Sequence, residues 1–276
     1  MLRRLIASLA APGLLALGTA AARQPVGIAY WDLDRFYDTI PSPFYNDDDH
    51  TPGGRLRWTA ERYARKVRNT AAVIDSMALP LVALWGVENE AVVRDIVSAC
   101  RGDYSYLHCT LDALDGIDFA LLYYGDLFFP GKVEPGRRYL AVEGTLRRPD
   151  GCDTLCLVLC GDERMAEWVV RDLRAERPGV QLLVAGRIGR RTEAAYGLHD
   201  ATARAEAAGR GNVHRRGGWL MRDRIAADTA LRMTGGDVFM RRYLVDQKTG
   251  TPLRTYDGKR YRGFYGEALP VFAYIE

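Results

Sequence analysis

The chain has 276 residues, of which 48% are hydrophobic and 26% carry a charge. This composition is ordinary for a globular protein and supplies enough apolar surface for one large core, which excludes a largely unfolded polar chain. The formal net charge is only +3. It gives no strong basic field that would draw the whole protein onto nucleic acid or a membrane surface.

The first 22 residues have the pattern of a cleavable signal peptide. A basic start (Arg3, Arg4) precedes the apolar run 5–17, which is too short to span a bilayer, and an A-x-A site ends at Ala22. We expect cleavage near Ala22 and export to the periplasm or the cell exterior, with an uncleaved anchor as the alternative. Loss of the two arginines lowers the formal charge from +3 to +1. Residues 23–276 then form a single domain, in which we expect no transmembrane segment.

The predicted elements follow one another without a linker or an internal repeat. We expect strands over 27–31, 79–85, 115–124, 138–146, 154–160, 181–185, 222–226 and 269–275, and helices over 57–77, 88–100 and 163–175. Residues 147–151 read as a hairpin turn, and residues 186–218 as a polar segment rich in glycine and arginine. One α/β domain with mixed sheets is the fold class that this order predicts.

Carboxylates lie directly after one predicted strand and within another, and each needs polar partners. Asp32 and Asp34 follow the first strand, where α/β sheets commonly bind ligands, although acidic residues there also cap turns. Asp118 lies within an apolar run that should be buried, and burial of a carboxylate is costly unless hydrogen-bond donors or a cation accompany it. For Asp118, a satisfied structural aspartate and a residue of a polar site remain open alternatives.

Generic catalytic motifs are absent from the sequence. It contains no G-x-S-x-G, no G-x-x-x-x-G-K and no H-E-x-x-H word. Its five cysteines include no C-x-x-C pair that would indicate a zinc site, and their odd number leaves at least one unpaired. A bridge between Cys100 and Cys109 is the pairing that the spacing allows.

Five short words, in order along almost the whole chain, resemble a known family. They are Trp-Asp-Leu-Asp-Arg-Phe-Tyr-Asp (31–38), Trp-Thr-Ala-Glu-Arg-Tyr (58–63), Val-Glu-Asn (87–89), Gly-Ile-Asp-Phe-Ala-Leu-Leu-Tyr (116–123) and Leu-Pro-Val (269–271). Together they resemble the endonuclease/exonuclease/phosphatase family, and the fourth word is the most specific. The resemblance implies a four-layer α/β sandwich, with two mixed β-sheets face to face between outer helices. Active members hydrolyse phosphodiesters or phosphomonoesters with Mg²⁺, a metal-binding glutamate, histidines and water-positioning Asp and Asn residues.

Most of the family's active-site positions are substituted in this sequence. Asp32 replaces the phosphate-positioning Asn, Gly86 the metal-binding Glu, Cys160 a His, Arg187 and Gly189 the Asp and Asn of the water-activating G-D-F-N-D word, Glu267 an Asp, and Ala268 the catalytic His. Carboxylates remain at Asp34 and at Asp223, which matches the Asp that orients the lost His. Asp118 and Tyr123 of the most specific word remain candidate site residues, and Glu88 should point to the face opposite Gly86.

These substitutions remove the reaction chemistry that the resemblance implies. Gly86 offers no side-chain oxygen to a divalent cation, and Arg187 cannot accept a proton from water. Ala268 removes a donor to the phosphoryl oxygens. Each loss typically costs about 10²–10⁴-fold in rate. We therefore expect a non-catalytic binding or scaffolding protein with no resident cofactor, whose partner is another protein or an anionic, phosphorylated ligand.

The arginines near the substituted positions suggest two versions of this hypothesis. In one, Arg35 and Arg187 pair with Asp32, Asp34 and Asp118 as a structural replacement for the metal. In the other, arginine forks bind an anionic ligand. The candidates for that role are Arg35, Arg187, Arg190, Arg191, Arg215 and Arg216.

The competing hypothesis is an enzyme. It would be a divergent phosphodiesterase, endonuclease or phosphatase that uses Mg²⁺ or Mn²⁺, with Asp34 and Glu267 as metal ligands. The carboxylates available for such a rebuilt site are Asp32, Asp34, Glu88, Asp118 and Glu267. Three or more carboxylates converging within ligand distance would favour the enzyme, whereas Arg–Asp pairs filling the cleft would favour the scaffold.

Overall fold

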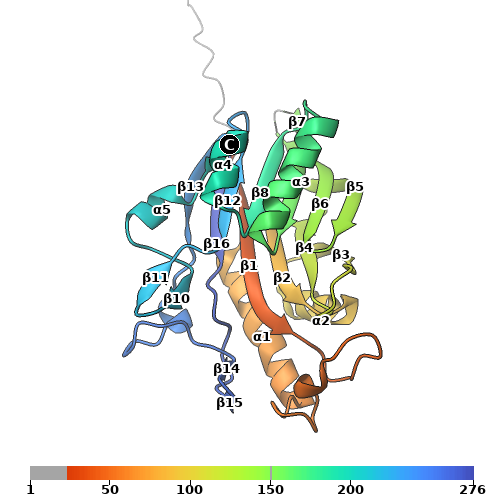
Figure 1. The fold of residues 1–276 in the computed structure, drawn as a ribbon, viewed down its shortest axis with the longest axis vertical. Helices are drawn as coiled ribbons and strands as arrows, with labels where there is room; N and C mark the ends of the chain where they lie inside the picture. Colours follow the sequence, from red (N-terminus) through yellow and green to blue (C-terminus); the bar gives the residue numbers. More distant parts are fainter. Residues whose placement is uncertain (1–23, 150) are drawn as a thin grey trace, which may run out of the picture.

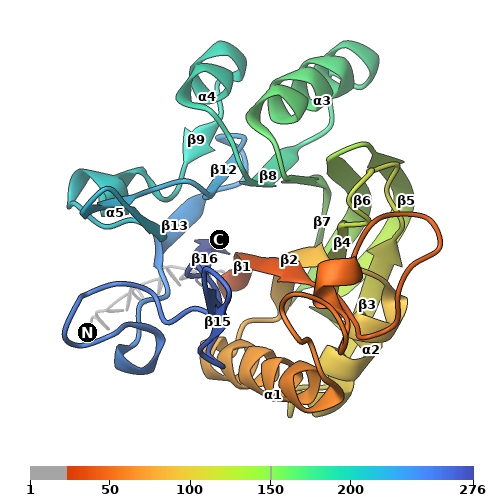
Figure 2. The ribbon, with the colours of Figure 1, turned by 60° about the horizontal axis from the view of Figure 1, so that its bottom comes forward.

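The computed structural model describes residues 24–149 and 151–276. The expected signal peptide, residues 1–22, lies outside the described residues. The described chain forms two large mixed sheets that face each other, with helices on the outer faces (Figures 1 and 2). The predicted fold class is confirmed. No helix in the described part of the chain is long and apolar enough to cross a membrane.

The first sheet has six strands. In spatial order they are β13 (Met233–Val238), β16 (Val271–Ile275), β1 (Val26–Phe36), β2 (Leu81–Val87), β4 (Asp118–Tyr124) and β3 (Tyr104–Cys109). β1 and β2 are parallel, and the other neighbours are antiparallel. β1 and β2 lie at the centre of this sheet, and polar residues of the site follow or end these two strands.

The second sheet also has six strands. In spatial order they are β5 (Phe128–Gly136), β6 (Tyr139–Arg148), β7 (Gly151–Cys160), β8 (Leu182–Gly186), β12 (Arg224–Ala227) and β9 (His199–Asp200). The parallel pair here is β7 and β8. β6 and β7 form the predicted hairpin, with Arg148 paired to Gly151.

Helices cover the outer faces of the two sheets, as Figure 2 shows. The helices are α1 (Ala60–Met77), α2 (Glu90–Ala99), α3 (Glu163–Glu176), α4 (Arg190–Tyr196) and α5 (Ala203–Ala207). α1 and α2 lie on the first sheet and α3 and α4 on the second. Thr59, Asn89 and Asp162 cap the first three of these helices by accepting backbone N–H bonds. The caps explain why these three helices begin where polar residues precede an apolar stripe.

Short elements complete the described chain. They are the 3₁₀ helices Asp48–His50 and Arg242–Leu244 and the hairpins β10 (Val213–Arg215) with β11 (Gly218–Leu220) and β14 (Tyr256–Asp257) with β15 (Arg260–Tyr261). The first of these hairpins begins within the segment 186–218, which the sequence predicted to be polar, and ends just beyond it.

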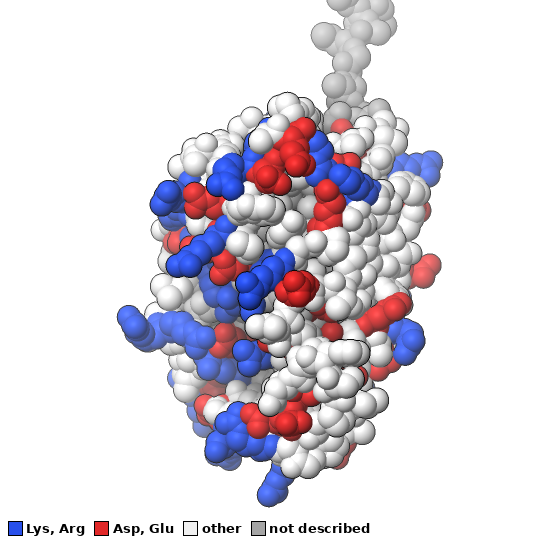
Figure 3. All heavy atoms as spheres, turned by 45° about the vertical axis from the view of Figure 1, so that its right-hand side comes forward, with Lys and Arg blue, Asp and Glu red and all other residues white. Residues whose placement is uncertain are grey.

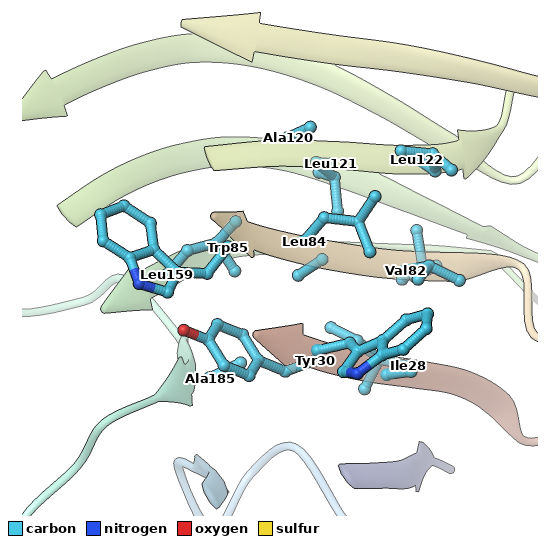
Figure 4. Close-up of a cluster of buried hydrophobic side chains, with 14 of the residues drawn as sticks. Ile28, Tyr30, Val82, Leu84, Trp85, Ala120, Leu121, Leu122, Leu159 and Ala185 are labelled. Atoms are coloured by element: carbon cyan, nitrogen blue, oxygen red, sulfur yellow. The ribbon is translucent and has the colours of Figure 1, made fainter. Parts of the chain in front are cut away.

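The core lies between the two sheets. Tyr30 of β1 lies beside Ala185 of β8, and Trp85 of β2 beside Leu159 of β7 (Figure 4). All four side chains are buried. The apolar runs that predicted these strands are therefore buried on both faces, between a helix layer and the opposite sheet. This packing fixes the strands whose ends carry the polar residues.

The structure differs from the sequence prediction at the edges of the sheets and in the segment 186–218, where α4, β9 and α5 were not predicted. The first strand does not end at Trp31 but continues to Phe36, so Asp32 and Asp34 lie within it. β3, β5 and β13 were not predicted, because they are edge strands whose burial is irregular. β5 contains two prolines, which an edge strand tolerates because one side of its backbone has no partner.

Candidate functional site

The polar residues singled out by the sequence meet at one edge of the sandwich. The carboxyl-terminal ends of β1, β2 and β8 lie there, together with the segments that precede β12 and β16. A cavity of about 330 Å³ opens between them, and its walls include Asp32, Asp34, Arg35, Gly86, Arg187 and Glu267. Positions far apart in the sequence therefore form one cleft.

Two carboxylates of this cleft, Asp32 and Glu267, share one arginine, Arg222, which directly precedes Asp223 and lies behind the residues that line the cavity. Its Nη2 donates to Asp32 Oδ2 at 2.7 Å and to Asp223 Oδ2 at 3.0 Å. Its Nη1 donates to Glu267 Oε1 at 3.0 Å. One guanidinium thus joins three carboxylates from separate segments. The charge-assisted bonds of such a fork are stronger than neutral ones.

A buried asparagine holds the arginine's own segment in place. Asn212 Nδ2 donates to Asp223 Oδ2 at 2.6 Å, and Asn212 Oδ1 accepts the backbone N–H groups of Arg222 and Asp223. The backbone carbonyl of Asn212 accepts from the N–H of Leu269 at 2.8 Å. Asp223 therefore orients Arg222 and Asn212 rather than a histidine.

Two further arginines complete the pairing. Arg187 Nη2 donates to Asp32 Oδ2 at 3.1 Å. Arg187 Nε is buried without a hydrogen-bond partner, 3.9 Å from Asp223 Oδ1. Arg215 Nη2 donates to both oxygens of Glu267, at 2.9 and 2.7 Å. Every carboxylate in the Arg222 network consequently has two basic or amide partners.

Burial and charge act against each other in this network. Burial raises the pKa of Asp32, and Asp223 adds to the rise, while Arg222 and Arg187 lower it. Burial also lowers the pKa of Arg222, but the attraction of Asp223 and Asp32 outweighs it, so the net shift is upward. The guanidinium stays charged at every working pH. Its positive charge is what allows Asp32 and Asp223 to lie close together.

The backbone beside the cleft has an unusual conformation at Gly86, the position at which the resemblance implies a metal-binding glutamate. Gly86 has φ +100°, a conformation that L-residues rarely adopt, and a Cβ there would lie 3.3 Å from the Arg35 amide nitrogen. The facing part of β1 bulges, with Asp34 at φ 54° and Arg35 at φ 57°. A glutamate at position 86 does not fit this backbone without distortion.

A buried lysine from α1 supports the bulge. Lys66 Nζ donates to the Leu33 carbonyl at 2.8 Å and lies 3.5 Å from the carbonyls of Asp34 and Arg35. It also lies 4.7 Å from the centroid of the Phe36 ring. Burial lowers the pKa of Lys66 to about 8. The strained segment is therefore held by bonds from a second element.

The remaining substituted positions are filled by packing or by backbone contacts. Ala268 is buried, and its carbonyl accepts from Trp31 Nε1 at 2.9 Å. Cys160 is buried at the end of β7, and burial raises the pKa of its thiol far above the usual range. The Cys160 carbonyl accepts from the Arg187 N–H at 2.8 Å. Gly189 is the N-terminal cap of α4. None of these positions presents an acid–base group to the cleft.

Several other candidates lie elsewhere. Asp118 accepts from the Leu111 N–H at 2.8 Å and pairs with His108 Nε2 at 3.0 Å. Glu88 accepts from the Asp38 N–H and the Tyr45 hydroxyl. Asp118 and Glu88 line a different cavity, so they do not join the carboxylates of Arg222.

Tyr123, at the opposite end of β4 from Asp118, packs against Phe128. Among the arginines, Arg190 pairs with Glu206 and Arg191 lies 3.8 Å from Glu167, both outside the cleft. All five cysteines are free, so the bridge that the spacing allowed is not present. The expected pairing of Arg35 with a carboxylate is also not seen among the described residues.

The donor set of the cleft does not fit a divalent cation. Asp32 uses Oδ2 for two guanidinium groups and Oδ1 for the Asp34 N–H, and both oxygens of Glu267 face arginines. A hard cation needs several free oxygen ligands. Within residues 24–149 and 151–276, no group of three His, Cys, Asp or Glu side chains is arranged to hold a metal. Converging carboxylates are present, but arginines fill the space between them.

This structure is an α/β sandwich whose polar site lies where the central strands of both sheets end. A family model described as the Endonuclease/Exonuclease/phosphatase family matches residues 27–155. No curated protein matches the sequence. The match confirms the resemblance of this chain to the endonuclease/exonuclease/phosphatase family, and solved structures extend the likeness in fold to nearly the whole chain.

Three of these structures come from Bacteroides species. An endonuclease/exonuclease/phosphatase family protein from Bacteroides thetaiotaomicron is 12% identical, with 92% of this chain and 98% of that chain covered and a TM-score of 0.59. Its counterpart from Bacteroides vulgatus is 11% identical, with 92% and 99% covered and a TM-score of 0.61. A mannosyl-6-phosphatase from Bacteroides thetaiotaomicron is 12% identical, with 91% and 100% covered and a TM-score of 0.59. At these identities the likeness shows the fold alone.

Sequence reasoning located the cleft but missed its central residue. Arg222 and Asn212 match no position of the family's active-site words. The only signal was that an arginine directly precedes the retained Asp223. Asp32 and Arg222 are 190 residues apart in the sequence, and only the folded chain brings them together.

Proposed function

We propose that this protein is an exported, non-catalytic member of the endonuclease/exonuclease/phosphatase fold that acts by binding or scaffolding. The observation that carries the proposal is Arg222, whose guanidinium pairs with Asp32, Asp223 and Glu267 in the cleft. The positive charge of the Arg222 side chain balances these carboxylates, as a bound metal ion would. This side chain cannot activate water, because a guanidinium neither loses its proton nor carries a bound hydroxide.

The missing reaction groups support the same conclusion. Catalytic phosphoester hydrolysis needs a group that activates water and donors that stabilise the transferring oxygens. At the matching positions stand Arg187, Gly189 and a buried Ala268. The strained backbone at Gly86 prevents simple restoration of a metal-binding glutamate. A rebuilt carboxylate site would first have to expel the arginines that occupy it.

The proposal of export is supported by the sequence of residues 1–22, which has a basic start, an apolar run and an A-x-A site. Charged groups of both signs are mixed on the face shown in Figure 3. This mixture supports specific binding at a local site rather than attraction by a single-sign field.

One observation favours an anionic ligand as the occupant of the cleft. Arg187 lines the cleft, and its side chain is 34% exposed. Arg35 and Arg138 line the same cavity. An incoming phosphate or carboxylate could accept from these groups. A mannosyl-6-phosphatase is among the proteins of similar fold, which makes sugar phosphates a reasonable class to test.

The experiment is a hydrolysis assay with the purified protein and Mg²⁺ or Mn²⁺. The substrates are bis(p-nitrophenyl) phosphate, plasmid DNA and mannose 6-phosphate, with an intact family member measured in parallel. We expect no turnover above buffer from a well-folded sample. Metal-dependent turnover that Asp34→Ala abolishes would show instead that a rebuilt carboxylate site performs the chemistry. A titration with mannose 6-phosphate in the absence of metal tests the anionic-ligand version, which requires salt-sensitive binding.

A further inference from the structure

A second cavity, of about 570 Å³, lies outside the Arg222 cleft. It is formed between the loop that follows β1 (residues 38–45) and the loop that leads into β4 (residues 110–116), with Glu88 and Asn89 at the end of β2. A volume of this size is typical of sites for small organic ligands. Neither the reaction chemistry of the family nor the proposal above uses this cavity.

The walls of this cavity are held in place by partly buried contacts. The Tyr45 ring lies against Gly116, where a Cβ would come within 2.3 Å of the ring and where φ is +59°. The Tyr45 hydroxyl donates to Glu88 Oε1 at 2.9 Å, and the Tyr37 hydroxyl donates to the Asp115 carbonyl at 2.8 Å. The two loops are therefore joined to each other and to the sheet. The cavity is a built feature rather than a gap between unsupported loops.

Three large apolar side chains among its lining residues are exposed. Phe44 is 90% exposed, Leu114 85% and Ile40 70%. Single exposed apolar residues are normal, but three around one cavity form a local apolar patch. Such a patch gains free energy when an apolar body covers it.

The polar part of this cavity is negatively charged. Four carboxylates line it, those of Asp38, Glu88, Asp112 and Asp118, and none of its described lining residues is Lys or Arg. Asp38 accepts from the Ile40 N–H and the Asn89 side chain. Exposed Asp112 has no hydrogen-bond or ion-pair partner among the described residues. Asp118 pairs with His108, which lies outside the lining, whereas no Lys or Arg lines the cavity to compensate the charge of Asp38, Glu88 and Asp112.

The pKa of Glu88 reflects both its burial and, to a smaller extent, the neighbouring carboxylates. Burial raises its pKa to about 7, with further upward contributions from Asp38 and Asp47, while the Asp38 N–H and the Tyr45 hydroxyl lower it. Asp118 differs from the other three carboxylates, because its Oδ2 lies 3.0 Å from Nε2 of His108, a residue that does not line the cavity. A cation brought into the cavity would relieve the repulsion among the carboxylates and favour the ionised form of Glu88.

We propose that this cavity binds a small organic cation with an apolar body. The cationic end faces Glu88 and Asp112, and the apolar body packs against Phe44, Leu114 and Ile40. An anion is disfavoured because like charges repel in a partly desolvated site. Repulsion by the same carboxylates also disfavours contact with an anionic membrane surface, which the apolar side chains by themselves would favour. The inference does not depend on whether the Arg222 cleft is inactive.

The test is a titration of the purified protein with three molecules that share one apolar body. These are 3-phenylpropylammonium, 3-phenylpropan-1-ol and 3-phenylpropanoate, measured by calorimetry and by ligand-observed NMR. We expect the ammonium to bind at least about tenfold more tightly than the alcohol, and the carboxylate to bind most weakly. Phe44→Ser and Asp112→Asn should each weaken binding of the ammonium several-fold. Both positions are exposed, so the variants should fold.

Matched controls are Leu220→Ser and Asp257→Asn, which remove an exposed leucine and an exposed aspartate outside this cavity. They should leave the titration unchanged. Equal affinity for the ammonium and the alcohol would overturn the proposal, as would the absence of saturable ammonium binding. So would ammonium binding that Phe44→Ser and Asp112→Asn leave unaltered. Weakening by these two variants, and not by their controls, would support the assignment.

Discussion

Replacement of Arg222 by alanine tests the role of the arginine directly. The change leaves Asp32, Asp223 and Glu267 close together without their shared guanidinium. Removal of one partner of a buried ion pair costs about 3–5 kcal/mol. The lower end applies here, because the Arg222 side chain is 21% exposed and because Asp32 and Glu267 keep Arg187 and Arg215. We expect the free energy of unfolding to fall by about 3 kcal/mol.

The assay is urea denaturation followed by tryptophan fluorescence, with and without MgCl₂. A matched control is Arg232→Ala, which removes an exposed arginine 3.8 Å from Glu276 and should change stability by no more than about 0.5 kcal/mol. Loss of Arg222 removes the positive charge shared by the three carboxylates, so a cation that takes its place would be attracted to them even though Arg187 and Arg215 remain. With a dissociation constant of about 1 mM, about 10 mM Mg²⁺ would restore about 1.4 kcal/mol to the variant. The unaltered protein should gain much less.

Two results would refute this reasoning. If Arg222→Ala is as stable as the unaltered protein, the guanidinium does not compensate the three carboxylates. If Mg²⁺ stabilises the unaltered protein as much as the variant, a metal binds in spite of the arginines, and the cleft is not a structural replacement for a metal centre.

Three further substitutions have distinct expected signatures. Gly86→Ala should lower the free energy of unfolding by about 2–3 kcal/mol in urea denaturation, because alanine at φ +100° is strained and its Cβ would lie 3.3 Å from a backbone nitrogen. Gly250→Ala, at φ +67° with open space around it, should cost only about 1 kcal/mol. Lys66 has its pKa lowered to about 8 from an ordinary value near 10.5, so the folded state loses its proton first as the pH rises. The stability of the unaltered protein relative to Lys66→Met should therefore rise by about 3 kcal/mol between pH 8 and 10.5, and a flat difference would contradict the burial of a charged amine. Glu88 has its pKa raised from 4.5 to about 7, so the folded state keeps its proton to a higher pH than the unfolded state does. Between pH 4.5 and 7 the free energy of unfolding of the unaltered protein should therefore fall by about 2 kcal/mol relative to that of Glu88→Gln, after allowance for solvent screening. Denaturation curves across the pH range would show a constant difference if Glu88 titrates normally.

The interior of the fold could be predicted from the sequence because burial leaves a clear pattern. Continuous apolar runs predicted β2, β4, β7 and β8, and helical spacing predicted α1, α2 and α3. Edge strands could not be predicted in the same way. β5 carries two prolines, and β3 is only half-buried, so neither shows the alternation or continuity of a central strand.

The site was predictable only where it coincides with family positions. The resemblance to the family assigned three residues to one site, and the structure brings them together in one cleft: Asp32, Gly86 and Glu267. Arg222 occupies no such position. Its importance depends on three segments that meet only in the folded chain. The cavity that Asp118 lines could not be predicted from the sequence either. It depends on a register shift between β2 and β4 beside this residue.

The guanidinium of Arg222 also changes what the protein requires from its surroundings. A metal ion at this edge would be in exchange with solution, so its occupancy would vary with the supply of the ion and with chelators. An arginine is synthesised with the chain and remains at fixed stoichiometry for the life of the molecule. The segments that carry Asp32, Asp223 and Glu267 are therefore held together to the same extent in metal-rich and metal-poor surroundings. The contacts between these segments depend on a residue of the chain and not on an ion supplied by the solution.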